Sequence, residues 1–153
     1  MIIDKINTQL LIHSSDFCIS KVKFNFTNSL NKPYKALWTS TLIDTNSSSW
    51  DLWCQINEFN IKNHNIKYKI IPKDNLKIFE INNEEDLNFL PKIYNPIFNK
   101  NVIDFNIIAK LFDGIHCINY VLPQLYGWDC ESTVWFNTNW IKSIERLGDK
   151  NCA

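Results

Sequence analysis

Glu131 is the residue of this sequence best suited to chemistry. It lies in the segment CESTVWF (130–136), where successive side chains alternate between the two faces expected of a strand. A carboxylate at the start of a rigid strand is well supported as a positioned hydrogen-bond acceptor. An ordinary solvent-facing acid at the edge of a sheet explains the same pattern, so both interpretations stay open.

Tryptophan gives the second candidate feature, because the chain contains six of them. Trp38 lies in the apolar segment YKALWTST (34–41), and Trp50 and Trp53 follow three residues apart. Rings at this spacing share one face of a helix, where they more often fill a core than line a ligand site. Flat aromatic rings can also stack on a flat ligand.

Histidine, cysteine and glycine add no recognised motif. His13 ends an apolar segment, where a structural histidine is the commoner interpretation, and His116 and Cys117 share no zinc-ligand spacing with another residue. The five cysteines include no Cys-x-x-Cys and no local signature of a Cys-His nucleophile, which predicts free thiols in a reducing compartment. The three glycines are scattered, so the sequence has no phosphate loop.

Composition predicts one globular domain over residues 1–153. Apolar residues make up 45% of the chain, aromatic residues make up 14%, and the formal net charge is zero. No basic stripe indicates nucleic-acid binding. No signal peptide and no run of about 20 apolar residues is present, so we expect a soluble cytoplasmic protein without a membrane partner.

The elements that must position these residues follow from periodicity and capping. We expect strands over 8–15, 17–26, 34–41, 66–72, 76–81, 113–122 and 130–136, and a polar loop over 27–33. We expect helices from Ser48 onward, over 82–90, and over 103–112 with Asp104 as cap. Because the order lacks a regular strand–helix alternation, it predicts an α+β fold with a mostly antiparallel sheet.

Three regions, taken in order, resemble the signatures of the diphtheria-toxin and poly-ADP-ribose-polymerase branch of the ADP-ribosyltransferases. They are LLIHSS (10–15), ALWTSTLIDTNSSSWDLWC (36–54), and LFDGIHCINYVL (111–122) followed by GWDCESTVWFNTNWI (127–141). The resemblance covers essentially the whole chain. It implies a split, mostly antiparallel sheet with short helices around an NAD cleft.

The resemblance also implies roles for individual residues. Glu131 would be the catalytic glutamate, and His13 would bond a ribose hydroxyl of NAD. Trp38 would be the aromatic residue of the second strand, and Trp53, with Trp50 as the alternative, would stack on nicotinamide. The remaining cofactor-binding candidates are Ser14, Ser40 and Ser49.

Three positions depart from the family pattern. Ser14 stands where glycine is usual, Trp38 stands where tyrosine is usual, and Asp129 is the acid two residues before the glutamate. A second branch of the superfamily uses arginine, then Ser-Thr-Ser, then Glu-x-Glu. The segments WTST and DCE of this sequence weakly resemble the last two of these motifs. His13 favours the first branch.

The implied activity is that of a mono-ADP-ribosyltransferase that uses NAD as co-substrate and needs no metal. A carboxylate aimed at the ribose would stabilise the positive charge that develops as nicotinamide leaves. The acceptor would be a protein or a nucleic acid, and the protein a toxin, an effector or a phage or bacterial conflict protein. The alternatives are a non-catalytic binding or immunity-type domain with a degraded site, and an NAD-dependent RNA 2′-phosphotransferase.

Overall fold

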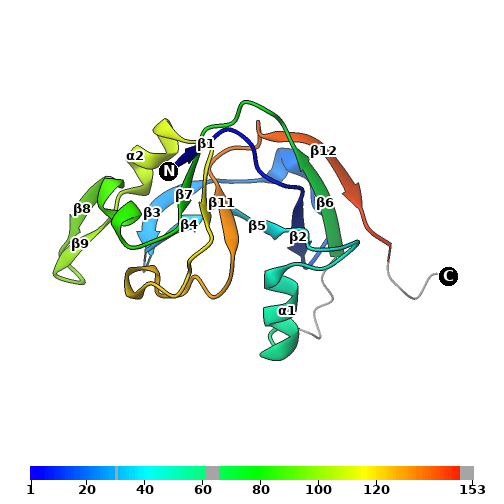
Figure 1. Cartoon of the computed structure of the whole chain (residues 1–153), viewed down its shortest axis with the longest axis horizontal. Coiled ribbons are helices and arrows are strands. Elements are labelled where there is room, and N and C mark those ends of the chain that lie inside the picture. The colour runs from blue at the N-terminus through cyan, green and yellow to red at the C-terminus, as the bar shows by residue number, and fades with distance from the viewer. Residues whose placement is uncertain (30, 61–65, 149–153) are drawn as a thin grey trace.

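A computed structural model describes residues 1–29, 31–60 and 66–148. One eight-stranded sheet runs through these residues in the order β1-β7-β10-β11-β5-β2-β6-β12 and curls into a half-barrel (Figure 1). Its strands are β1 (Ile2–Ile3), β2 (Gln9–His13), β5 (Leu37–Thr41), β6 (Ile66–Pro72), β7 (Ile78–Ile81), β10 (Gly114–Cys117), β11 (Ser132–Trp135) and β12 (Ile141–Arg146). Neighbours are antiparallel except β7 and β10, so the expected α+β class with a mostly antiparallel sheet is confirmed.

Two short helices begin where the capping residues predicted them. α1 (Ser49–Ile56) follows Ser48, whose hydroxyl accepts from the Asp51 amide at 3.3 Å. α2 (Phe105–Leu111) follows Asp104, whose carboxylate accepts two amides of the first turn. The remaining elements are the hairpins β3 (Asn25–Ser29) with β4 (Lys32–Lys35) and β8 (Lys92–Asn95) with β9 (Lys100–Ile103), and 3-10 turns at Ile19–Lys21, Glu85–Phe89 and Pro123–Leu125.

The predicted strand over 17–26 is wrong, and so is the predicted loop over 27–33. A 3-10 turn occupies Ile19–Lys21, and extended pairing starts at Asn25, in the hairpin that replaces the loop. The amide of Phe17 donates to the hydroxyl of Tyr68 at 3.0 Å, and the two rings pack with centroids 5.9 Å apart. Phe17 is therefore held by a contact with β6 rather than by a strand of its own.

Apolar side chains fill both faces of the sheet. On one face, Ile115 and Val134 pack with Phe105 and Ile108 of α2. On the other, Ile70 and Ile78 pack with two fully buried tryptophans, Trp135 and Trp140, which stack with centroids 3.7 Å apart. The central strands are thus buried on both sides, which makes them a rigid support for any residue at their ends.

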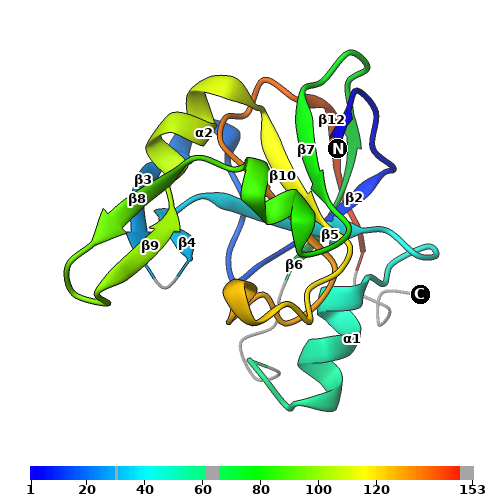
Figure 2. The same ribbon diagram turned by 60° about the vertical axis from the view of Figure 1, so that its left-hand side comes forward.

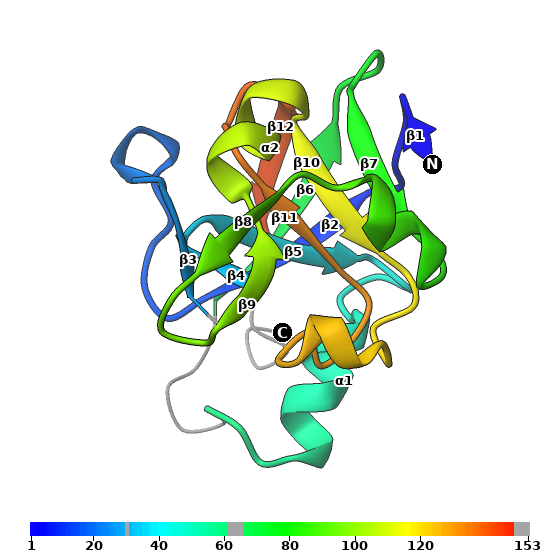
Figure 3. The ribbon, with the colours of Figure 1, turned by 90° about the vertical axis from the view of Figure 1, so that its left-hand side faces the viewer.

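The sheet parts between β2 and β5, and this separation positions the site. The two strands pair at Gln9–Thr41 and Leu10–Ser40, and among the described residues their register extends no further. β2 instead continues along β6 as far as the pair His13–Ile66. α1 lies near this opening, beside the loop that precedes β11 (Figures 2 and 3).

Candidate functional site

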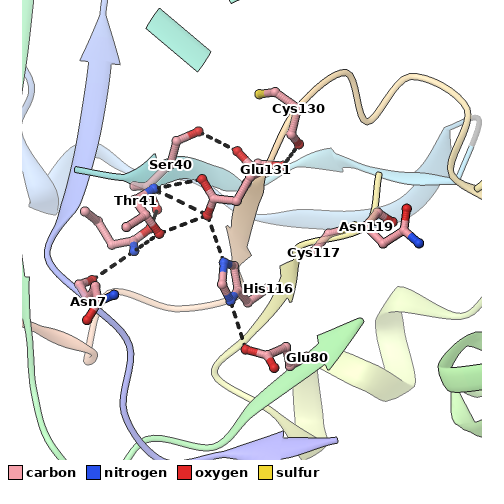
Figure 4. Close-up of polar contacts among 12 residues, drawn as sticks. Asn7, Ser40, Thr41, Glu80, His116, Cys117, Asn119, Cys130 and Glu131 are labelled. Atoms are coloured by element: carbon pink, nitrogen blue, oxygen red, sulfur yellow. Dashed lines mark hydrogen bonds and ion pairs between the residues drawn. The ribbon is translucent and has the colours of Figure 1, made fainter. Parts of the chain in front are cut away.

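Glu131 is held in place by hydrogen bonds from neighbouring strands (Figure 4). Its carboxylate accepts from the Thr41 amide at 3.1 Å and from the Thr41 hydroxyl at 2.9 Å, and it lies 2.8 Å from Nε2 of His116. Its own carbonyl accepts from the Ser40 hydroxyl at 2.8 Å. Only 18% of the side chain is exposed, so this carboxylate has a fixed direction and is not a mobile surface acid.

His116 connects Glu131 to a second carboxylate. Its Nδ1 lies 3.3 Å from an oxygen of Glu80, because the parallel register of β10 with β7 sets these two residues side by side. The three side chains are 10–18% exposed. A neutral imidazole can donate to one of the two carboxylates, whereas a doubly protonated ring donates to both. Sequence reasoning did not find Thr41, His116 or Glu80 as members of the site.

A cavity of about 280 Å³ occupies the split between β2 and β5. Its walls come from both strands, from α1 and from the loop before β11. They are formed by Leu10, Ile12, Lys32, Trp38, Thr39, Ser40, Trp50, Gly127, Trp128, Asp129, Cys130 and Ser132. The aromatic walls and few polar groups are typical of a small-molecule site, and the volume suits one part of a dinucleotide.

Of the tryptophan pair of α1, Trp50 and not Trp53 lies in the cavity wall. The rings of Trp50 and Trp53 stack with centroids 5.1 Å apart, and Phe59 packs edge-on against both. Trp50 lines the cavity, and Trp53 lies behind it. The reason is that Ser48 bridges back to Leu42 just beyond β5, which brings the first turn of α1, and so Trp50, nearest the sheet.

The wall at Trp38 already contains a cation. Nζ of Lys32 lies 5.3 Å from the centroid of the Trp38 ring, and the edge of Trp128 meets the same ring with centroids 4.9 Å apart. Burial lowers the pKa of Lys32, and the nearby charge of Asp129 opposes that shift. This end of the cavity therefore contains a lysine ammonium together with the carboxylate of Asp129.

The structure brings some of the predicted residues together and separates others. Trp38 and Ser40 line the cavity beside the backbone of Glu131. His13 lies four residues beyond Gln9 on β2, about 13 Å along the strand from the Thr41 end. Its ring packs against Phe17, and its Nδ1 lies 2.8 Å from the Ser15 carbonyl.

Ser14 and Ser49 are likewise not among the residues that line the cavity. Ser14 is exposed just after β2, and Ser49 is the first residue of α1, half-buried next to the cap Ser48. Leu10 and Ile12 line the cavity, so His13 alternates to the opposite face of β2. Trp38 and Ser40 thus line the cavity at the split. Glu131 lies between the cavity-lining residues Cys130 and Ser132 in the sequence, and its side chain turns instead toward Thr41 and His116, while His13 lies farther along β2.

A second depression of about 430 Å³ adjoins the same carboxylate. It includes Thr41, Glu80 and His116, together with the charged side chains of Lys5, Lys73 and Asp74. Glu131 therefore lies between an aromatic cavity, which its neighbours Cys130 and Ser132 line, and a polar depression, which its bonding partners line.

Metal chemistry would need groups that bind a metal ion, and thiol chemistry would need thiols that act as nucleophiles. Within the described ranges no group of three or more His, Cys, Asp or Glu side chains could hold a metal ion. The four cysteines in those ranges are free. Burial raises the pKa of Cys117 and of Cys130 to about 12, so both are poor nucleophiles near neutral pH. None of the helices in those ranges is long and apolar enough to cross a membrane.

No known protein family, curated protein or solved structure matches this chain. Its function has to be inferred from the geometry of the site and from the chemistry of its residues.

Proposed function

We propose that the chain is an NAD-dependent mono-ADP-ribosyltransferase whose NAD cleft is the split between β2 and β5. One observation carries this proposal. The carboxylate of Glu131 is held by Thr41 and His116 on the side of the polar depression, and its chain neighbours Cys130 and Ser132 line the tryptophan-walled cavity beside the last paired residues of β2 and β5. A flat cationic ring beside a fixed carboxylate is what cleavage of the nicotinamide–ribose bond requires.

The arrangement of charge suggests how NAD lies in the cavity. Glu131 and Trp50 are both near the Thr41 end of β5, Glu131 through its hydrogen bonds and Trp50 through the Leu42–Ser48 bridge. Lys32 lies over Trp38, three residues back along the strand. We therefore place the cationic nicotinamide against Trp50 and the anionic diphosphate toward Lys32.

The proposed reaction uses the carboxylate as an electrostatic group. The bond between nicotinamide and the ribose breaks, and its electron pair leaves with neutral nicotinamide. Glu131 accepts a hydrogen bond from a ribose hydroxyl and stabilises the positive charge that develops on the ribose. A nucleophilic atom of the macromolecular acceptor then bonds to the same ribose carbon and loses its proton to solvent.

His13 and Ser14 keep the status of predictions. His13 is the last residue of β2 and Ser14 follows it, and neither lines the cavity. A non-catalytic binding domain is the alternative with an observation in its favour, because Lys32 already covers one tryptophan face of the cavity. A role as a toxin, effector or conflict protein follows from family analogy alone.

Labelled NAD tests the proposal. The purified chain would be incubated with a cell extract and NAD labelled in its adenosine phosphate, and macromolecules would then be treated with protease or nuclease. We expect covalent label with the wild type and none with Glu131→Gln, while Glu145→Gln, an exposed acid of β12, matches the wild type. Saturable NAD binding without nicotinamide release or transferred label would instead show a binding domain.

A further inference from the structure

We propose that His116 is the positioning residue for Glu131 and that Glu80 fixes the ring of His116. The three side chains then act as one unit at the polar side of the cleft. This inference rests on the proposed function and deepens it, because it names which oxygen of Glu131 meets the substrate.

The acceptor sites of the carboxylate support this assignment. Oε1 accepts from the Thr41 hydroxyl at 2.9 Å and lies 2.8 Å from Nε2 of His116, which fills its two lone pairs. Oε2 accepts from the Thr41 amide at 3.1 Å and retains one lone pair. The carboxylate is thus locked through Oε1, and Oε2 is the oxygen free to accept a ribose hydroxyl.

Glu80 holds the other side of the imidazole. Its Oε2 lies 3.3 Å from Nδ1 of His116, and its Oε1 accepts from the side-chain amide of Asn82 at 3.0 Å. β10 lies between β7 and β11 in the sheet, so the backbone fixes the spacing of all three side chains. A doubly protonated ring donates to both carboxylates and cannot turn away from Glu131 without losing that bond.

Measurements of kcat and KM distinguish a positioning role of His116 from a merely structural one. We expect His116→Phe to lower kcat for nicotinamide release by about 10- to 100-fold, as loss of a residue that orients a functional side chain does. The KM for NAD should stay within about twofold, since the lost contact acts on the transition state. His116→Gln, whose amide can donate to Oε1, should recover part of kcat. Glu80→Gln should cost about tenfold in kcat, and Glu145→Gln should cost nothing.

A second readout does not depend on turnover. The Thr41 amide resonance in ¹H–¹⁵N spectra reports the placement of the carboxylate to which that amide donates. Among the described residues Glu80 bonds neither Thr41 nor Glu131, so His116 is the hydrogen-bonded link through which Glu80→Gln would move the carboxylate and shift this resonance. Glu145→Gln should leave the resonance in place.

The outcomes distinguish the two proposals. A shifted Thr41 amide in a protein that never cleaves NAD supports the positioning role and refutes the proposed function. An active enzyme refutes the positioning role if His116→Phe keeps wild-type kcat, or if it loses NAD affinity and kcat remains. The positioning role is equally refuted if the Thr41 resonance is the same in wild type and Glu80→Gln.

Discussion

Thr41 donates to the carboxylate of Glu131 from its backbone amide, at 3.1 Å to Oε2 and 3.4 Å to Oε1, and from its hydroxyl, at 2.9 Å to Oε1. The residues are 90 positions apart in the chain and meet where β5 ends and β11 is about to begin. A backbone donor cannot rotate away, so the direction of the carboxylate is fixed by the sheet itself.

The Thr41 hydroxyl should contribute to turnover. Thr41→Val keeps the amide bond and the side-chain shape but removes the bond to Oε1. A hydrogen bond to a charged group contributes about 1.5–3 kcal/mol, so kcat for nicotinamide release should fall at least tenfold. Thr41→Ser retains the hydroxyl and should stay close to wild type. Equal kcat in Thr41→Val and Thr41→Ser would contradict this role.

Trp50 should matter for NAD binding more than Trp53 does. Both residues are tryptophans of α1, but Trp50 lines the cavity and Trp53 lies behind it. Stacking of aromatic rings contributes about 0.5–1.5 kcal/mol, so Trp50→Leu should raise the KM for NAD up to about tenfold. Trp53→Leu should have a smaller effect. The reverse order would show that nicotinamide contacts Trp53, as the sequence alone suggested.

Trp135 and Trp140 allow the contribution of one buried hydrogen bond to stability to be measured. Both are fully buried and stack on one another, but Nε1 of Trp135 donates to Thr39 at 2.7 Å, whereas Nε1 of Trp140 has no partner among the described residues. Phenylalanine at 135 leaves the Thr39 hydroxyl without its donor, which costs about 1–3 kcal/mol. Urea unfolding should therefore give a larger loss of unfolding free energy for Trp135→Phe than for Trp140→Phe. Equal losses would show that the bond to Thr39 adds nothing.

The parts of the fold that could be predicted are those determined locally. Ser48 and Asp104 cap helices through side-chain bonds to amides within three residues, so the sequence alone indicates both starts. The strand that follows Glu131, β11, was visible from the alternation of 130–136. The strand expected over 17–26 failed because Phe17 is bound by Tyr68, and that contact spans 51 positions of sequence.

The parts of the site that were missed depend on strand register. His116 meets Glu80 and Glu131 through the pairing of β10 with two neighbours, one parallel and one antiparallel. No spacing within a single sequence reports either register. The sequence also could not show that Trp50, rather than Trp53, lines the cavity, because the bridge from Leu42 to Ser48 decides which turn of α1 faces the sheet.

The cysteines should differ in the rate at which they react with an alkylating reagent. The hydrogen bond with the Ser20 side chain lowers the pKa of the exposed Cys18, whereas burial raises the pKa of Cys117 and Cys130 to about 12. The thiolate is the reactive form, and of these three thiols Cys18 gains the most thiolate as pH rises toward 8. Peptide mass spectrometry after brief iodoacetamide treatment, in a Cys152→Ser background, should find Cys18 modified first. Modification of Cys117 at the same rate would contradict the burial.

The rate of nicotinamide release from NAD tests the central claim most directly. Glu131→Gln keeps the size of the side chain and removes the charge that the proposed mechanism requires. We expect measurable release by the wild-type protein, a loss of about 100-fold or more in Glu131→Gln, and an unchanged rate in Glu145→Gln. Equal rates in wild type and Glu131→Gln, or no release by either, would contradict the proposal that this chain cleaves NAD at Glu131.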